Sequence, residues 1–254
     1  MSRHEARSPD AHVLAGRRPV LEALKAGQPL HTVLIARELA PSAIVGQIRK
    51  RAERASVTVR VVPKVELDRA AGLVNHQGVV ALGAGFRYAA LEDVLSAPQR
   101  AVLFLDGIMD PHNLGSLLRS ADGAGFSGVV IPERRAASVT PAARRVSAGA
   151  AEVVRVARVA NLGRALDGAR EAGLWVVGLD AKASDDLWTS QLVEPPVAIV
   201  LGSEDRGLSK GVRGHCDGFV RIPARGKLDS LNVGSAGAIA MFEVARRRDA
   251  PGGP

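Results

Sequence analysis

Cysteine is nearly absent from this chain: its 254 residues include one, Cys216. A single thiol excludes a disulfide framework within the chain and fits a reducing compartment. The sequence also lacks any apolar run near the ~18 residues of a membrane-spanning helix, and no apolar segment follows its first residues. These absences predict a soluble, cytoplasmic protein with no membrane partner.

Aromatic residues are scarce, at 3%, although hydrophobic residues reach 46%. This composition suits an α/β core of aliphatic side chains, but it has too few aromatics for the base-stacking platform of single-strand binders. Acidic residues are outnumbered, 26 Asp and Glu against 34 Lys and Arg, for a formal charge of +8. The basic excess favours a polyanionic partner bound through its phosphates; the alternative is an Arg-rich surface that only solubilises the protein.

Several common site motifs are missing. His215 and Cys216 have no partner at metal-ligand spacing and the six His are scattered, so no metal site is predicted. There is no Walker sequence and no G-x-S-x-G nucleophile elbow. A G-x-G-x-x-G match at residues 123–128 follows a helical pattern and precedes a strand, the reverse of a dinucleotide fingerprint. It therefore predicts a helix end and a turn.

The strand and helix patterns divide the chain into two α/β parts. Residues 1–12 are polar and predict a disordered arm. Residues 13–83 alternate strand and helix patterns and form a small predicted domain. Residues 84–100 form a predicted linker, and residues 249–254 a flexible tail. Residues 101–248 alternate near-continuous apolar strands with helices, among them a closing helix over residues 230–248, which predicts a mostly parallel sheet covered on both faces.

The first candidate site lies where a buried strand, residues 101–105, turns into a helix near Asn113. Asn113, Gly115 and Arg119 lie in the opening turns of that helix. In many α/β folds a strand, a tight turn and such a helix start form an anion- or RNA-facing site. The alternative is a plain strand–helix connection with Arg119 in water.

Two further stretches follow predicted strands. Residues 201–208 read L-G-S-E-D-R-G-L; Gly202 would let a ligand approach the backbone, at the strand end where ligands usually bind. In residues 222–236, Ser230 is a plausible helix N-cap, with Asn232 two residues later. The small residues 234–237 predict very close packing there. The alternatives are an ordinary turn and tight helix–sheet packing.

The three stretches resemble the motifs of the SpoU (TrmH-type) family of RNA ribose 2'-O-methyltransferases. The matching residues are Asn113, Gly115 and Arg119 (N-x-G-x-x-x-R), Gly202, Glu204 and Gly207 (G-x-E-x-x-G), and residues 230–233 (S-L-N-V). Residues 13–83 look like the family's substrate-binding domain, which is similar to ribosomal protein L30e. The arrangement is most similar to the RlmB branch, whose members methylate a guanosine ribose in 23S ribosomal RNA.

The resemblance implies a SPOUT-type methyltransferase domain over residues 101–248 with a deep C-terminal trefoil knot, an exception to the usual absence of knots. It implies S-adenosylmethionine (SAM) as methyl donor, no metal, and a homodimer with its active site at the subunit interface. SAM would be bound by Leu201, Gly202, Ser203, Gly207, Ile222 and Leu231. RNA would be held through its phosphates by Arg17, Arg18, Arg49, Arg134, Arg144, Arg145 and Arg225.

The resemblance assigns catalysis to Arg119, Asn113, Glu204, Ser230 and Asn232. A ribose 2'-OH is a weak acid and a weak nucleophile, so it needs orientation and help in losing its proton. Because an Arg almost never deprotonates, we expect Arg119 to polarise the hydroxyl and bind the neighbouring phosphate. Asn113 and Glu204 would hold the Arg119 side chain, while Ser230 and Asn232 would shape the pocket.

The sequence departs from the family pattern at residues 205–206, Asp-Arg where Gly-Lys or Gly-Glu is common, and at Gly234, where Ser is usual. The target also stays open. Alternatives within the family are a transfer RNA, or a ribosomal site whose methylation gives antibiotic resistance. The alternative from another class is a non-catalytic RNA-binding or ribosome-assembly protein with this fold. A nicotinamide dehydrogenase is disfavoured by the misplaced glycine fingerprint.

Overall fold

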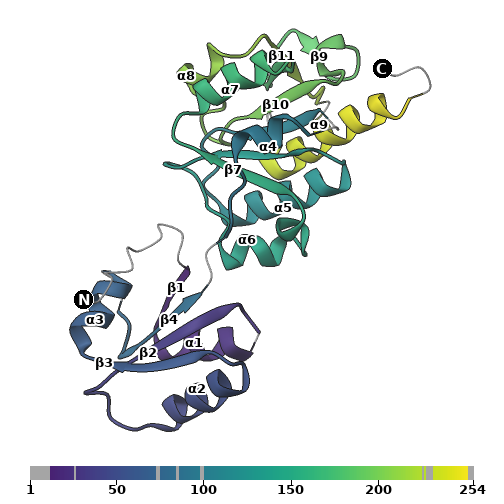
Figure 1. The fold of residues 1–254 in the computed structure, drawn as a ribbon. Coiled ribbons are helices and arrows are strands. Elements are labelled where there is room, and N and C mark those ends of the chain that lie inside the picture. Colours follow the sequence, from purple (N-terminus) through teal and green to yellow (C-terminus); the bar gives the residue numbers. More distant parts are fainter. Residues whose placement is uncertain are drawn as a thin grey trace. The chain divides into compact units, whose positions relative to one another are not determined.

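The protein is represented by a computed structural model that describes residues 12–25, 27–72, 75–83, 86–97, 100–224, 226 and 231–250. The chain divides into two compact units between Arg87 and Tyr88 (Figure 1). Within the described residues, no helix is both long and apolar enough to cross a membrane.

The first unit is a four-stranded sheet ordered β1-β4-β2-β3, in which only β2 and β3 are parallel neighbours. Its elements are β1 (His12–Ala15), α1 (Arg17–Lys25), β2 (Leu30–Ala36), α2 (Ala43–Arg54), β3 (Thr58–Val62), α3 (Lys64–Ala71) and β4 (Val79–Gly83). Alternate residues of β2 enter two separate cores, because strand side chains point to opposite faces. Val33 packs with α1 and α2, whereas Leu34 packs with Leu67 of α3.

The second unit is a seven-stranded sheet ordered β7-β6-β5-β10-β8-β11-β9, and all its paired strands are parallel. Its strands are β5 (Ala101–Leu105), β6 (Gly128–Pro132), β7 (Arg155–Val159), β8 (Trp175–Leu179), β9 (Asp185–Asp186), β10 (Val197–Leu201) and β11 (Gly218–Arg221). Its α-helices are α4 (Leu91–Leu95), α5 (Pro111–Gly123), α6 (Pro141–Val146), α7 (Leu162–Glu171), α8 (Lys210–Arg213) and α9 (Val233–Arg248), with 3-10 turns at Ala150–Glu152 and Gln191–Val193. The predicted parallel sheet is confirmed.

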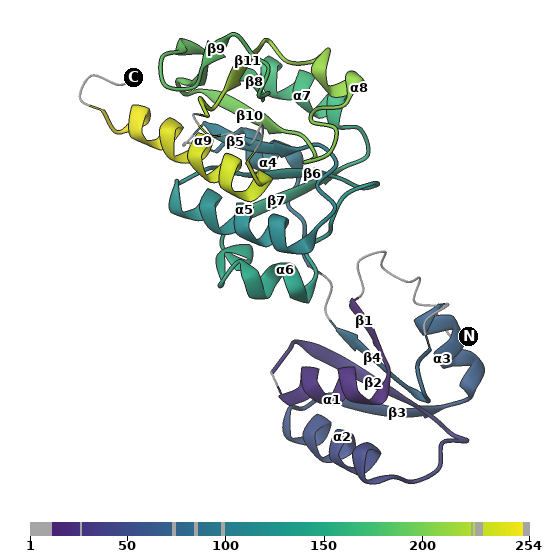
Figure 2. The ribbon, with the colours of Figure 1, turned by 180° about the vertical axis from the view of Figure 1, so that it is seen from behind.

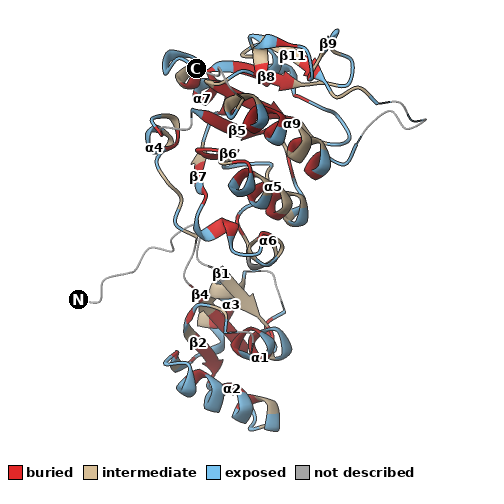
Figure 3. Cartoon of the chain, turned by 90° about the vertical axis from the view of Figure 1, so that its right-hand side faces the viewer, coloured by how far each residue is buried: buried red, intermediate tan, exposed pale blue. Residues whose placement is uncertain are grey.

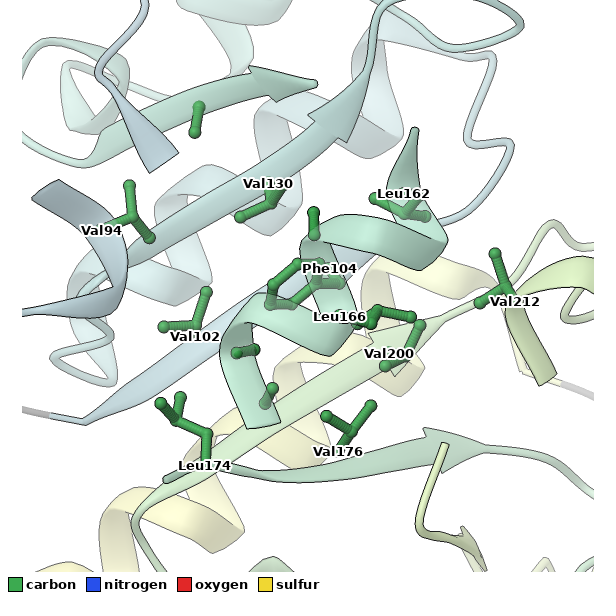
Figure 4. Packing of buried hydrophobic residues seen from close by; sticks show 14 of the residues in the cluster. Val94, Val102, Phe104, Val130, Leu162, Leu166, Leu174, Val176, Val200 and Val212 are labelled. Atoms are coloured by element: carbon green, nitrogen blue, oxygen red, sulfur yellow. The ribbon is translucent and has the colours of Figure 1, made fainter. Parts of the chain in front are cut away.

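Helices cover both faces of this sheet, so its central strands β5 and β10 are buried along their whole length (Figure 3). On one face Phe104 and Val200 pack against Leu166 of α7 in a single aliphatic core that also includes α4 (Figure 4). On the other face α5 and α9 lie side by side (Figure 2). There Leu201 of β10 touches Gly237 of α9 so closely that an added Cβ would lie 2.7 Å from its Cδ1 atom.

Part of the predicted linker belongs instead to the second unit. Residues 91–95 form α4, and Val94 is fully buried in the aliphatic core beneath it. Ala89 also forms a parallel bridge to Ala157 of β7. The glycines at the start of this stretch and the Pro-Gln-Arg at its end favoured a linker, but the apolar side chains between them dock this short helix. Residues 84–85 and 98–99 lie outside the described residues.

Two helices of the second unit begin at capped positions. α6 begins at Pro141, a residue type that favours the first turn, and the Thr140 hydroxyl caps it by accepting from the Ala143 amide at 3.3 Å. The closing helix starts at Val233, and its N-cap is Asn232. Ser230, the predicted N-cap, lies outside the described residues. The turn predicted at residues 123–128 is confirmed, since α5 ends at Gly123.

The C-terminal end of α9 is fastened to two other segments. Glu243 is buried and accepts hydrogen bonds from Arg246 and from Arg247 at 2.8 Å. Arg247 also donates to the carbonyl oxygens of Ser190 and Leu187, at 2.6 and 2.9 Å. The hydrogen bond from Arg246, and then that from Arg247, holds the pKa of the Glu243 carboxyl below its usual value of 4.5.

This network predicts a pH-dependent part of the stability. Because the pKa of Glu243 is lower in the folded than in the unfolded chain, its contribution is present above the unfolded pKa and is lost as the pH falls through the folded pKa. We expect Glu243→Gln to lower the melting temperature by about 4 °C at pH 7 and by less near pH 4. Thermal unfolding across this range, with exposed Glu133→Gln as control, tests it; a constant deficit would contradict it.

Candidate functional site

Two cavities open at the carboxyl edge of the seven-stranded sheet, on either side of the segment that follows β10. The large cavity, of about 900 Å³, lies beyond the ends of β8, β10 and β11 and is lined by Leu179, Leu201 and Ile222 among others. The small cavity, of about 610 Å³, lies beyond β5, β6 and β10 and is lined by Asp106 and Pro132 among others. Ligands of open parallel sheets bind at this edge, so both cavities are candidate sites.

The wall between the cavities is a tight turn at residues 202–207. Ser203 and Gly207 exchange backbone hydrogen bonds of 3.1 and 2.8 Å. Gly202 has to be glycine, because a Cβ there would lie 2.1 Å from the carbonyl carbon of Gly207. Gly207 has a left-handed φ of +63°, which also favours glycine. The turn itself therefore requires the first glycine of the second motif and favours the second.

The Glu204 carboxylate joins all three sequence motifs. Its Oε1 atom accepts hydrogen bonds from Asn113 Nδ2 at 3.3 Å, from Asn232 Nδ2 at 2.6 Å and from the Val233 amide at 3.2 Å. Asn232 Nδ2 also donates to Asn113 Oδ1 at 3.1 Å. We call these four residues the Glu204 hub. It fixes α5, the turn and α9 against one another at the point where the cavities meet.

Helix capping places the two asparagines in the hub. Asp110 caps α5 by accepting from the His112 amide at 2.9 Å, and this hydrogen bond is the main reason that the pKa of Asp110 is lowered. Asn113 therefore lies in the first turn of α5. At the other helix, Asn232 Oδ1 accepts from the amides of Gly234 and Ser235, so Asn232 serves α9 and the hub together.

Small residues let α5 and α9 approach closely behind the hub. A Cβ on Gly237 would lie 2.3 Å from Leu117 of α5, and one on Gly234 would lie 3.2 Å from the Ser116 hydroxyl oxygen. A side chain at Gly234 would therefore require the Ser116 hydroxyl to shift by only a few tenths of an ångström. Gly115 plays the same part between α5 and α6, where a Cβ would lie 2.5 Å from the Ala143 carbonyl oxygen.

Arg119 lies apart from the hub. It is exposed on α5, and it forms no hydrogen bond or ion pair within the described part of the chain. Six residues along a helix separate it from Asn113, a rise of about 9 Å, and it is not among the described residues that line either cavity. The sequence predicts that Asn113 and Glu204 hold the Arg119 side chain. In the structure they bind each other and Asn232 instead.

The residues expected to bind a cofactor lie together. Leu201, Gly202, Ser203, Gly207, Ile222 and Leu231 all line the large cavity. No sequence motif marks the opposite rim of the cavity, where Asp180 accepts from the Lys182 amide at 2.9 Å and forms an ion pair with Arg213. The Lys182 bond first, and then Arg213, lowers the pKa of Asp180. The only signal in the sequence was an acidic residue directly after a strand.

The residues expected to bind RNA are spread over both units. Arg17, Arg18 and Arg49 belong to the first unit, and Arg17 donates to the Gln77 carbonyl at 2.9 Å. In the second unit Arg134 lines the small cavity, Arg145 is exposed and Arg144 is paired with Glu152 at 2.6 Å. Arg225 lies outside the described residues. Among those described, no cluster of His, Cys, Asp or Glu could hold a metal ion.

Comparison with known proteins identifies the family. Residues 100–242 match the model of the SpoU rRNA methylase family, and residues 13–89 match that of the RNA 2'-O ribose methyltransferase substrate-binding domain. This chain belongs to the SpoU methylase family. The family predicted from the three motifs is thereby confirmed, and the protein is a SpoU-family RNA methyltransferase.

Related proteins are similar to this chain in sequence or structure over almost its whole length. A Bacillus subtilis (strain 168) protein named as a TrmH family tRNA/rRNA methyltransferase, YacO, is 39% identical over 93% of this chain and 96% of its own length. The SpoU methyltransferase AviRb from Streptomyces viridochromogenes, solved with AdoMet, is 26% identical, with a TM-score of 0.63 over 94% of this chain and 91% of its own. An AdoMet-bound rRNA methyltransferase from Sinorhizobium meliloti is 27% identical, with the same TM-score over 95% and 89%.

The Glu204 hub predicts different effects for two substitutions. Glu204→Gln keeps an oxygen that can accept from Asn113, Asn232 and the Val233 amide, so we expect its melting temperature to change little. Glu204→Ala leaves these donors without their acceptor and should lower the melting temperature by about 5 °C. Thermal unfolding measures both, with Asp205→Ala in the same turn as control. Equal melting temperatures for Glu204→Ala and Asp205→Ala would contradict a joining role.

Proposed function

We propose that this SpoU-family protein uses SAM to methylate a ribose 2'-OH of an RNA, and that its target is a guanosine of 23S ribosomal RNA. The observation that carries the proposal is the Glu204 hub, which joins the three family motifs between two adjacent cavities. A transferase for two substrates needs two neighbouring sites. A transfer RNA target is the second candidate, favoured by the tRNA/rRNA name of the Bacillus subtilis relative.

The large cavity fits SAM. Its volume lies within the range of about 300–1,000 Å³ that small-molecule sites occupy. Gly202 leaves the backbone bare for close approach to a ligand. The cavity is lined by five carboxylates and three cationic side chains: Asp180, Asp185, Glu204, Asp205 and Asp217, with Lys182, Arg206 and Arg213. Carboxylates suit a ligand with sulfonium and ammonium charges. When bound, SAM supplies a methyl group that is already electrophilic, so no metal is required.

The residues around the cavities then have distinct tasks. Leu201, Ile222 and Leu231 exclude water from the donor, while the turn at residues 202–207 holds it against the sheet edge. Glu204 and Asn113, fixed by their mutual hydrogen bond, border the place where the ribose must lie. Orientation of a weak nucleophile in a near-attack position is itself a large part of the catalysis.

The active protein is proposed to be a homodimer in which Arg119 serves the cavity of the second subunit. The support is the position of Arg119, exposed and outside both cavities of its own chain. A guanidinium that polarises the 2'-OH and binds the adjacent phosphate must reach the hub, and a two-fold partner can bring it there.

The fold is proposed to include the trefoil knot of SPOUT-type proteins and an L30e-like first unit. In support of the knot, α9 follows β11 in the chain yet packs against α5 and β10. The Leu187–Glu194 region holds the far end of that helix through Arg247. In support of the first unit, residues 13–89 match a substrate-binding domain.

Methyl transfer tests the function directly. We expect labelled methyl groups from SAM to enter unmodified 23S ribosomal RNA, and reverse-transcription stops at limiting nucleotides to map them to one guanosine ribose. Transfer RNA serves as the comparison substrate, and labelling of it alone would establish the second candidate. If calorimetry detected no SAM binding and neither RNA were labelled, the protein would be a non-catalytic RNA binder and the proposal would fail.

Subunit mixing tests the role of Arg119. We expect Arg119→Ala to lower kcat at least ~100-fold with unchanged SAM affinity, because a charge-assisted contact at the reacting group is lost. Ala181→Trp should fill the large cavity and abolish SAM binding. Random dimers of the two variants should regain about a quarter of the wild-type rate, because half the dimers keep one complete site. No recovery would show that Arg119 acts within its own chain.

A further inference from the structure

The small cavity shares a wall with the large one. The turn at residues 203–207 and Val233 line both cavities, and Asn113 lines only the small one. A ligand in the small cavity is thus separated from a ligand in the large cavity by one turn of chain. An acceptor has to meet its donor across such a short separation.

Three of the four carboxylates that line the small cavity are already engaged inside the protein, whereas the fourth, Asp205, forms no hydrogen bond or ion pair with another described residue. Asp106 accepts from the Ser209 amide at 2.7 Å, and Asp110 accepts from the His112 amide at 2.9 Å. Glu204 is bound in the hub. These negative charges are therefore partly compensated by the backbone and by side-chain amides before any ligand arrives.

The guanidinium groups of the same cavity are not engaged. Arg134, Arg135 and Arg206 line it, and the side chain of none of them forms a hydrogen bond or an ion pair with another described residue. Arg135 also has a left-handed φ of +56°, a conformation that a non-glycine residue keeps only where its surroundings impose it. Unpaired guanidinium forks in a cavity match the geometry and charge of phosphate.

The rest of the cavity suits one nucleotide. Ile108, Met109, Pro132 and Val233 give it an apolar side, and Met109 is 65% exposed. None of the described residues that line it is aromatic. A base would accordingly pack on aliphatic carbon and the Met109 thioether, without an aromatic stacking partner. The volume of about 610 Å³ is that of a small-molecule site, too little for a duplex.

We propose that the small cavity binds the target nucleotide, with the phosphates that flank its ribose on Arg134 and Arg135. The ribose then lies against the Glu204 hub, and its 2'-OH faces the large cavity. Arg134 and Arg135 act as positioning residues: they hold the backbone of the nucleotide, not the reacting oxygen. This assignment rests on the proposed function, since it names the acceptor site of that reaction.

The test compares two double variants of the full-length protein that lose the same charge. Arg134→Ala with Arg135→Ala empties the cationic wall, and Arg155→Ala with Arg164→Ala removes two exposed arginines that line neither cavity. Methylation of unmodified ribosomal RNA gives kcat and KM, calorimetry gives SAM affinity, and a salt titration gives RNA affinity. Arg206 is left intact because it lines both cavities.

For the cavity pair we expect kcat/KM to fall about 100-fold, the effect of two lost charge-assisted contacts. The slope of log affinity against log salt should shrink by about 1.5, as two phosphate contacts are lost. SAM affinity should stay within about twofold of wild type, because neither arginine lines the large cavity. A loss of SAM affinity equal to the loss of rate would indicate that the substitutions disturb the structure. Arg134→Lys with Arg135→Lys should recover part of the rate, since it keeps both charges.

RNA in which one phosphate is replaced by an uncharged methylphosphonate distinguishes contacts beside the target nucleotide from contacts elsewhere on the RNA. Once the methylated nucleotide is mapped, a methylphosphonate next to it should slow the wild-type protein and leave the cavity pair unaffected, whereas one placed far along the RNA should slow both equally. Equal kcat/KM and salt slopes for the two double variants, with an active wild type, would overturn the cavity assignment alone. So would a cavity pair that loses SAM affinity in step with its rate. A wild type that labels no RNA would instead remove the proposed function.

Discussion

One carboxylate, that of Glu204, holds the functional end of this protein together. Its Oε1 atom binds the amides of Asn113 and Asn232 and the first backbone amide of α9. Three segments that are far apart in the chain therefore meet at one atom. These hydrogen bonds link the three segments, with Val233 buried and Glu204 and Asn232 exposed to water. The cavities on either side take their shape from this constraint.

The strand order of the parallel sheet positions the turn that carries Glu204. β10 lies between β5 and β8, so the segment that leaves it divides the carboxyl edge into two halves. Gly202 and Gly207 keep the dividing turn narrow, and the close contact of Gly237 with Leu117 brings α9 near enough for Asn232 to reach Glu204. The abundance of small residues in this chain is thus connected to the thin wall between the two cavities.

Much of this was readable from the sequence. Apolar runs such as residues 101–105 and 197–201 predict the buried strands. The three motifs predict the site, because they contain residues that cap a helix, form the turn and join the segments through Glu204. The sequence could not show that Asn113 and Glu204 would bind Asn232 in place of Arg119, since side-chain pairing depends on helix packing. Nor did it reveal α4, whose docking depends on Val94, or the rim at Asp180, which no local pattern marks.

The shared turn at residues 203–207 has a thermodynamic consequence. Filling either cavity presses on the same few atoms, so any shift of the turn on binding the first ligand alters the affinity for the second. Linkage requires the reverse effect to be of equal size. A donor that tightens the turn favours the acceptor by the same factor by which the acceptor favours the donor, and loss of the methyl group, which alters the contacts at this wall, changes both affinities at once. With both cavities filled as proposed, the partition couples the affinity of the donor site to that of the acceptor site.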